Sequence, residues 1–183
     1  QTRFSIDVSK INIAGFNYPG LLRGNIYSAR SINIHDIFAD ILVNMDKPYD
    51  INSTNPQMPN ELLSSMKEIV NVDSLKIING GLKYCERFSI GAAPGIVIFK
   101  KVNVSVSGIS NNTVHPGTAV IHGDGVFMNS GTMKLNMTIP LASKDFSLRY
   151  SGSLSTMDVT VLNSFIEAGE HQRIKSGILH SAS

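Results

Sequence analysis

Apolar and polar residues alternate along most of this sequence, and this period of two constrains the fold more than any other feature. Alternation is typical of β-strands that bury one face. It recurs in the stretches RFSIDV, INI, SINIHDIFADILVNM, GIVIFKKVNVSVSGI, TMKLNMTI and FSLRY. We therefore expect a mostly β protein, in which an elongated and curved antiparallel sheet forms a groove-like surface.

The alternation changes phase by one residue at two places. Apolar residues fall at even positions up to Val8 and at odd positions from Ile11, and the second change lies between Ile34 and Ile37. A slip of one residue moves side chains to the opposite face, so each change requires a bulge, bend or break. His35 and Asp36 adjoin the second change, which predicts a bulge with exposed polar side chains there.

Two segments have helical spacing instead. PNELLSSMKEIV opens with the start signal Pro59–Asn60 and repeats apolar residues through Ile69. MDVTVLNSFIEAG has Asp158 as a plausible N-cap and Gly169 as a C-terminal stop. The segment 46–60 is rich in Pro, Asn and Asp, which predicts a loop and a possible boundary between sub-units 1–58 and 59–183.

The pattern I-x-x-G-x-L occurs once after each predicted helix, beginning at Ile77 and at Ile174. A unit repeated in this way indicates a sheet built from helix-plus-strand repeats, each covering the apolar face of its neighbour. The second copy resembles the start of a hairpin that lacks its partner strand, and the chain begins with Gln1 rather than Met. We therefore expect residues 1–183 to be one β-rich segment of a longer protein.

Composition excludes several classes of function. Of the 183 residues, 42 % are hydrophobic and 16 % are charged, which permits a core. The net charge of +2, without a basic run, gives no electrostatic case for nucleic acid. A single cysteine, Cys85, excludes an internal disulfide framework, and no stretch reaches the roughly 18 apolar residues of a membrane span.

No group of residues has the spacing of a catalytic or metal site. HGDG, from His122 to Gly125, lacks a second ligand pair and predicts a polar turn or glycine bulge between strands. Cys85 has no neighbouring base that would activate a thiol. GAAPG, from Gly91 to Gly95, lacks the Lys-Ser/Thr ending of a phosphate loop and predicts a hairpin turn. We therefore expect no enzymatic activity, no cofactor and no metal, and exchange of His35, His122 or Asp124 for Ala should leave function intact.

The apolar stripes allow two interpretations. They form an ordinary core, or lipid chains cover part of the apolar face of a long sheet, favoured by about 0.8 kcal/mol for each buried CH₂ group. The residues expected to line such a face are Ile96, Ile98, Val102, Val104, Met133, Leu135, Met137, Phe146 and Leu148.

Two passages of the chain resemble AsmA-like proteins of Gram-negative envelopes. The resemblance extends from Leu62 to the C-terminus. In VDSLKIINGGLKYCERF and GIVIFKKVNVSVSGISN the matching positions are Ile77, Gly80, Leu82, Tyr84, Gly95, Ile96, Ile98, Phe99 and Val102. In YSGSLSTMDVTVLNSFIEAGEHQRIKSGIL they are Gly152, Leu154, Met157, Asp158, Leu162, Asn163, Ile174 and Gly177.

This resemblance implies a non-catalytic role in outer-membrane biogenesis. AsmA-like proteins are anchored in the inner membrane by an N-terminal helix and project a curved β-groove into the periplasm, where it is thought to carry phospholipids. The chain would then be an interior periplasmic segment, with phospholipid acyl chains as its ligands, and the membrane anchor would belong to the full-length protein. The alternative is a structural or adhesive β-module of the cell surface that binds a protein or a glycan, with a dry core and exposed edge strands.

Overall fold

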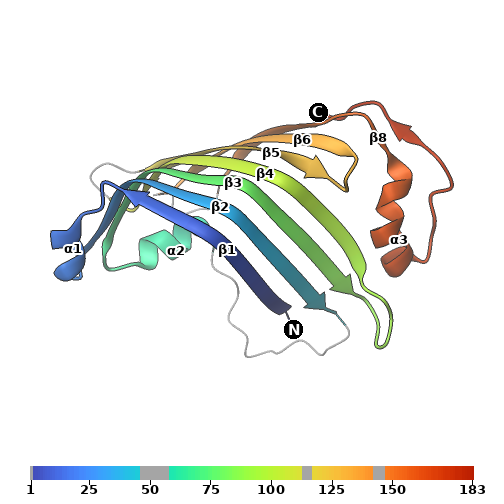
Figure 1. The fold of residues 1–183 in the computed structure, drawn as a ribbon, viewed down its shortest axis with the longest axis horizontal. Coiled ribbons are helices and arrows are strands. Elements are labelled where there is room, and N and C mark those ends of the chain that lie inside the picture. The colour runs from blue at the N-terminus through green and yellow to red at the C-terminus, as the bar shows by residue number, and fades with distance from the viewer. Residues whose placement is uncertain (1, 46–57, 113–116, 142–146) are drawn as a thin grey trace.

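The computed structural model describes residues 2–45, 58–112, 117–141 and 147–183. Its main body is a seven-stranded, unclosed sheet that arches along its length, with strands in chain order from β1 to β7 (Figure 1). This architecture confirms the predicted mostly β, curved and groove-like fold. The strands are β1 (Thr2–Ala14), β2 (Ile26–Asn44), β3 (Ile69–Arg87), β4 (Gly95–Ser110), β5 (Thr118–Phe127), β6 (Gly131–Pro140) and β7 (Arg149–Leu154).

Helices and one small second sheet complete the described fold. A two-stranded sheet pairs β8 with β9, separately from the main sheet. These further elements are α1 (Tyr18–Leu22), α2 (Pro59–Ser65), β8 (Met157–Asp158), the 3₁₀ helix η1 (Val159–Leu162), α3 (Asn163–Glu170) and β9 (Ile178–Leu179).

The two longest strands, β2 and β3, pair in parallel, whereas all other neighbours in the main sheet are antiparallel. Their register runs from the pair Ile26–Ile69 to the pair Asn44–Arg87. A parallel pair requires a crossover connection, and α2 lies within that connection. Residues on both sides of position 58 therefore share one sheet.

Left-handed residues interrupt three neighbouring strands along one line across the sheet. Asp36 in β2, Asn79 in β3 and Lys101 in β4 have φ angles of 51°, 56° and 50°. The Asn79 amide side chain donates to Asp36 Oδ1 at 2.6 Å, and the Asn79 backbone N–H donates to Asn103 Oδ1 at 3.1 Å. Asn103 Nδ2 in turn donates to Asp124 Oδ2 at 3.2 Å. The left-handed Asp36 confirms an interruption of β2 at the predicted position, but the register of β2 with β1 and β3 continues there without a shift, so the predicted bulge is not in β2. Register shifts occur instead between β3 and β4 and between β4 and β5. The left-handed residues keep apolar side chains on one face although their sequence phase changes.

The first predicted helix forms, but it is shorter than its apolar spacing suggests. It begins at Pro59 as predicted, and the Glu61 carboxylate accepts a hydrogen bond from the Met58 backbone N–H at 2.9 Å. It ends at Ser65, so the prediction that Ile69 belongs to the helix is wrong, because Ile69 opens β3. Asn111 enforces this change of structure, since its side chain donates to Glu68 O at 2.8 Å and accepts from Val70 N at 2.8 Å.

The second predicted helix has two parts. Asp158 is the predicted N-cap, and its Oδ1 accepts from the Thr160 backbone N–H at 2.9 Å, but the turn that it opens is the 3₁₀ helix η1. The α-helical part α3 follows and ends at Glu170, and the left-handed residue His171, with a φ of 54°, caps its C-terminus. The predicted stop at Gly169 is therefore wrong, because Gly169 lies inside the helix. A Cβ at that position would lie 3.0 Å from the Phe88 ring, so close packing explains the glycine better than a stop does.

The two copies of I-x-x-G-x-L occupy different structures. Gly80 lies in the middle of β3, beside the bulge at Asn79, whereas Gly177 precedes the short strand β9. The chain end also has a partner strand after all, because Ile178 and Leu179 pair with the earlier strand β8. Sequence reasoning missed this pairing because the partner lies upstream of the helix rather than downstream of the turn.

Two other elements differ from the sequence prediction. HGDG lies in the middle of β5, so the predicted turn there is wrong. The predicted alternative, a bulge, does occur opposite Gly125, but the register shift between Lys100 and Asn103 places its extra residue in β4. The short helix α1 was not predicted; the Asn17 side chain caps it by accepting from Gly20 N at 3.0 Å. The GAAPG turn is confirmed, since it lies between the antiparallel strands β3 and β4.

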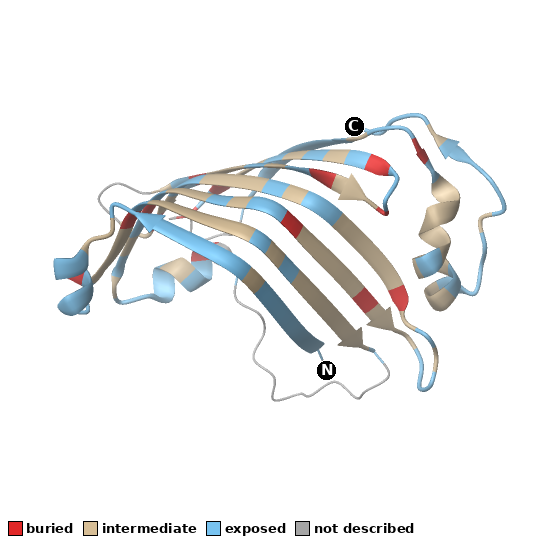
Figure 2. Ribbon diagram, in the orientation of Figure 1, coloured by how far each residue is buried: buried red, intermediate tan, exposed pale blue. Residues whose placement is uncertain are grey.

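The described residues contain a small core rather than a deep one. Its buried members are Ala119, Ile139 and Leu141, and Leu63 of α2 packs against them. Among the described residues, no large side chain is exposed by less than 2 %. Most of the central strands are coloured as intermediate and β1 largely as exposed in Figure 2. One layer of sheet with helices at its ends cannot bury both of its faces.

Candidate functional site

The sheet has one continuous apolar face, which we call the apolar face. The direction in which a Cβ would point at two glycines shows which side chains share this face. A Cβ at Gly80 would lie 3.0 Å from Ile77 Cγ2 and 3.3 Å from Ile37 Cγ2, and a Cβ at Gly125 would lie 3.2 Å from Val102 Cγ2. Alternation and cross-strand register extend this face over all seven strands. Its larger members are Phe4, Ile6, Ile11, Ile13, Ile32, Ile34, Ile37, Ile41, Leu75, Ile77, Leu82, Tyr84, Val97, Phe99, Val102, Val104, Val106, Ile121, Phe127, Met133, Leu135, Met137, Tyr150 and Leu154.

Among the described residues, helices cover this face only near its two ends, as the places of α2 under the arch and α3 beside it indicate (Figure 1). At one end Leu63 of α2 contacts the small core. At the other end Phe165 of α3 lies against Gly95, whose Cβ would be 3.0 Å from the Phe165 ring. The Phe165 ring also lies 5.7 Å from the Phe88 ring in an edge-to-face arrangement and 6.5 Å from the Tyr84 ring.

The apolar side chains between the helices, and above all those of β1, stay accessible to solvent. Phe4 is 65 % exposed and Ile6 is 64 % exposed, while Ile11 and Ile13 are 54 % and 53 % exposed. On the opposite edge of the sheet, Tyr150 is 73 % exposed. Single exposed apolar residues are normal on protein surfaces, whereas a contiguous exposed apolar patch is typical of an interaction surface.

The structure brings most of the predicted lining residues together. Val102, Val104, Met133, Leu135 and Met137 all lie on the apolar face, and Val104 lies opposite Gly123, which pairs with Leu135. Leu148 precedes β7 and is exposed, and Phe146 lies outside the described residues.

Ile96 and Ile98 lie on the other face of β4. Gly95 points toward Phe165, and Phe99 contacts the Phe127 ring at 5.1 Å between ring centroids, so the intervening even-numbered residues point the opposite way. The sequence prediction placed Ile96 and Ile98 on the same face as Val102 because it assumed that the strand is unbroken. The left-handed residue Lys101 shifts the phase, so Val97 and Phe99 take their places on the apolar face.

Sequence reasoning also missed the contribution of β1, β2 and β3 to this face. The signal was available, since Ile6, Ile34, Ile77 and Leu82 belong to the same alternating stretches. What could not be read from the sequence was which of these stretches would become neighbours in one sheet.

The opposite face, which we call the polar face, carries a row of polar residues across the entire sheet. Each residue of the row pairs with the next across adjacent strands. The row is Asn12, Asn33, Lys76, Ser105, His122, Asn136 and Ser151. An open hollow of about 420 Å³ lies along part of it, with Asn103, Asp124 and Lys134 among its lining residues.

The polar face does not assemble a catalytic group among the described residues. His122 Nδ1 lies 2.7 Å from Asn136 Oδ1, and His35 Nε2 lies 3.4 Å from Asn12 Nδ2, so neither histidine has a carboxylate partner. Within the described ranges, no three His, Cys, Asp or Glu residues are placed to hold a metal ion.

Two titratable groups of β3 have pKa values above their ordinary ones. Burial raises the pKa of the Tyr84 phenol, and the hydrogen bond of its hydroxyl to Glu86 Oε2 at 3.1 Å adds to that rise. Burial also raises the pKa of the Cys85 thiol, which keeps it protonated and unreactive at neutral pH. Desolvation is the largest cause of both pKa shifts.

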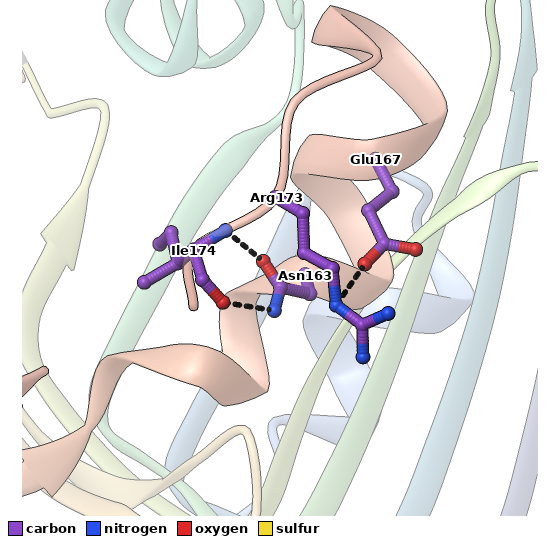
Figure 3. A network of polar contacts seen from close by, with 4 residues as sticks. All are labelled: Asn163, Glu167, Arg173 and Ile174. Carbon is purple, nitrogen blue, oxygen red and sulfur yellow. Dashed lines mark hydrogen bonds and ion pairs between the residues drawn. The ribbon is translucent and has the colours of Figure 1, made fainter. Parts of the chain in front are cut away.

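A carboxamide holds the C-terminal segment against α3 (Figure 3). Asn163 Oδ1 accepts from the Ile174 backbone N–H at 2.8 Å, and Asn163 Nδ2 donates to Ile174 O at 2.9 Å. The side chain thus satisfies both backbone groups of Ile174 as a neighbouring strand would. These are two of the positions on which the sequence resemblance depends, and their contact gives that spacing a physical reason.

Among the helices of the described residues, none is both long enough and apolar enough to cross a lipid bilayer. Comparison of the chain with family models, with curated proteins and with solved structures finds no match.

Proposed function

We propose that the apolar face binds the acyl chains of phospholipids, and that the chain is a periplasmic segment of an AsmA-like lipid carrier. The observation that carries the proposal is the accessible apolar face, which continues over seven strands and which the helices of the described residues cover only near its ends. The second support is the family resemblance of the passages from Leu62 onward.

The size of the hydrophobic term favours lipids with two acyl chains over single-chain ligands. A chain lying on an open face is covered on one side only, so about ten half-covered CH₂ groups contribute about 4 kcal/mol. That gross value corresponds to a Kd of about 1 mM, before the ligand's ordering cost is subtracted. Two acyl chains side by side double the buried apolar contact, so the dissociation constant falls well below that of a single-chain ligand.

The side chains on this face suit a variable ligand. Met133 and Met137 lie on β6, and methionine adapts its shape to irregular apolar partners. The mechanism requires no covalent step, because acyl chains lie against Ile, Val, Met and Phe side chains while the headgroup stays in water.

The decisive test compares neighbouring residues on opposite faces of one strand. Val104 lies on the apolar face and Ser105 on the polar face of β4. We would purify the chain and its Val104→Asp and Ser105→Asp variants from a Gram-negative host, and identify bound lipid by native mass spectrometry and lipid extraction. Phospholipid bound to the wild-type chain and to Ser105→Asp, but lost from folded Val104→Asp, is the expected result.

Wild-type chain without phospholipid, or equal loss of lipid in both variants, would refute the proposal. The cell-surface module that binds a protein or a glycan would then become the better hypothesis. Leu135→Asp on β6 provides a second substitution on the apolar face should Val104→Asp fail to fold.

A further inference from the structure

A carboxylate lies at the α3 end of the apolar face. Glu86 is the next-to-last residue of β3, and the strand register places it between Val43 of β2 and Gly95 of β4, which carry no charge. Its side chain points to the apolar face, because Glu86 Oε2 accepts a hydrogen bond at 3.1 Å from the hydroxyl of Tyr84, which belongs to that face. Glu86 is half-buried, so its charge needs a partner that compensates for lost water.

The described part of the chain supplies no cation for this carboxylate. The two side-chain ion pairs there involve the carboxylates of Asp40 and Glu167, and Glu86 belongs to neither. The Tyr84 hydroxyl donates to Oε2 only. A carboxylate accepts several hydrogen bonds, so Oε1 of Glu86 remains able to bind a donor from outside the chain.

Aromatic rings accompany the carboxylate. The Tyr84 ring carries the hydroxyl that donates to Glu86, and the centroid of the Phe165 ring of α3 lies 6.5 Å from that of the Tyr84 ring. The Phe88 ring lies 5.7 Å from the Phe165 ring. The faces of aromatic rings attract cations, as a carboxylate does. This end of the apolar face therefore combines the two kinds of group that recognise an ammonium ion.

We infer that Glu86 binds the ammonium group of a phospholipid headgroup, so that the apolar face selects ethanolamine phospholipids over those whose headgroup lacks a cation. This inference rests on the proposed binding of acyl chains to that face. Because Glu86 lies at the end of β3, acyl chains in contact with Leu82 and Tyr84 place their headgroup beside it. A primary ammonium N–H then donates a charge-assisted hydrogen bond to Oε1.

The same geometry disfavours an anionic headgroup. A phospholipid with glycerol in place of ethanolamine brings its phosphate charge without a compensating cation. That negative charge meets the carboxylate of Glu86 in a half-buried place, where water screens the repulsion less than it does in bulk solvent. Two lipids with identical acyl chains should therefore bind differently although their apolar contacts are the same.

A headgroup competition tests the inference. We would incubate the delipidated chain with an equimolar mixture of phosphatidylethanolamine and phosphatidylglycerol that carry the same acyl chains, and measure the ratio of the bound lipids by native mass spectrometry. We expect the wild-type chain to prefer phosphatidylethanolamine by about tenfold, the usual effect of a hydrogen bond between charged groups. Glu86→Gln keeps an oxygen acceptor for the Tyr84 hydroxyl but removes the charge, so the preference should fall below about threefold.

Glu68→Gln is the matched control, because it removes the same charge just before the opposite end of β3. The hydrogen bond from Asn111 at that position goes to the Glu68 backbone oxygen and not to the carboxylate. The ratio of bound lipids should therefore keep its wild-type value in Glu68→Gln. Glu86→Lys is a second variant at the site, and its preference should turn toward phosphatidylglycerol. Circular dichroism checks that each variant is folded.

The outcomes separate this inference from the proposal on which it rests. Lipid bound to the wild-type chain without a headgroup preference, or an equal loss of preference in Glu86→Gln and Glu68→Gln, would overturn the headgroup inference and leave acyl-chain binding standing. A wild-type chain that binds neither lipid would overturn both.

Discussion

Asn163 offers the sharpest test of how the C-terminal segment is held. We expect Asn163→Ala to release the segment, because it removes both hydrogen bonds to the Ile174 backbone, at 2.8 and 2.9 Å (Figure 3). A hydrogen bond of this kind contributes about 1 kcal/mol net, so losing two costs about 2 kcal/mol of local opening free energy. That value corresponds to about 30-fold faster hydrogen exchange at the Ile174 amide, since 1.4 kcal/mol is a factor of ten.

The adjacent ion pair supplies a matched control. Arg173 Nε lies 3.1 Å from Glu167 Oε1, with the two side chains 75 % and 47 % exposed. Exposed pairs contribute about 0 to 1 kcal/mol, so Glu167→Ala should change exchange at Ile174 by less than about fivefold. The measurement is amide hydrogen exchange followed by NMR. Equal effects of the two substitutions, or unchanged exchange in Asn163→Ala, would show that apolar packing of Phe165 and not the carboxamide holds the segment.

Three further predictions follow from packing and from the displaced pKa values. Gly95→Ala should loosen α3, because its Cβ would lie 3.0 Å from the Phe165 backbone oxygen. Gly123→Ala, whose Cβ would have its nearest contact at 3.7 Å, should leave α3 unchanged. Hydrogen exchange of the α3 amides measures both effects, and equal exchange in the two variants would contradict the packing argument. Cys85 is 4 % exposed and its pKa is raised, so iodoacetamide should alkylate it slowly at neutral pH and rapidly in denaturant, and rapid alkylation of the folded chain would disprove its burial. The hydrogen bonds from Thr160 hold the pKa of Asp158 below its ordinary 3.8, so their stabilisation of η1 is present above that pH and is lost as the pH falls through the lower folded value. The Thr160 amide shift should titrate there in the wild-type chain and not in Asp158→Asn; titration in both would refute the assignment.

The sequence by itself determined the strands and most of the division between their faces. Alternation depends only on the period of two in an extended chain, so Ile6, Val104 and Leu135 could be placed on apolar stripes without any tertiary information. Local capping chemistry was equally readable, as Pro59 and Asp158 demonstrate. The phase change at Asp36 predicted a real interruption of β2, which is a left-handed residue rather than a bulge, because both flanking stretches were apolar enough to fix their phases.

Only the tertiary structure decided which stripes join into one face. Lys101 adopts a left-handed conformation in line with the left-handed residues Asp36 and Asn79 of β2 and β3, and this moves Ile96 and Ile98 to the polar face. Likewise, Ile69 leaves its helical pattern because β3 pairs from that residue with Ile26, more than forty positions away in the chain. Bulges and strand partners depend on hydrogen bonds between distant segments, whereas the alternating pattern records only whether each side chain prefers water.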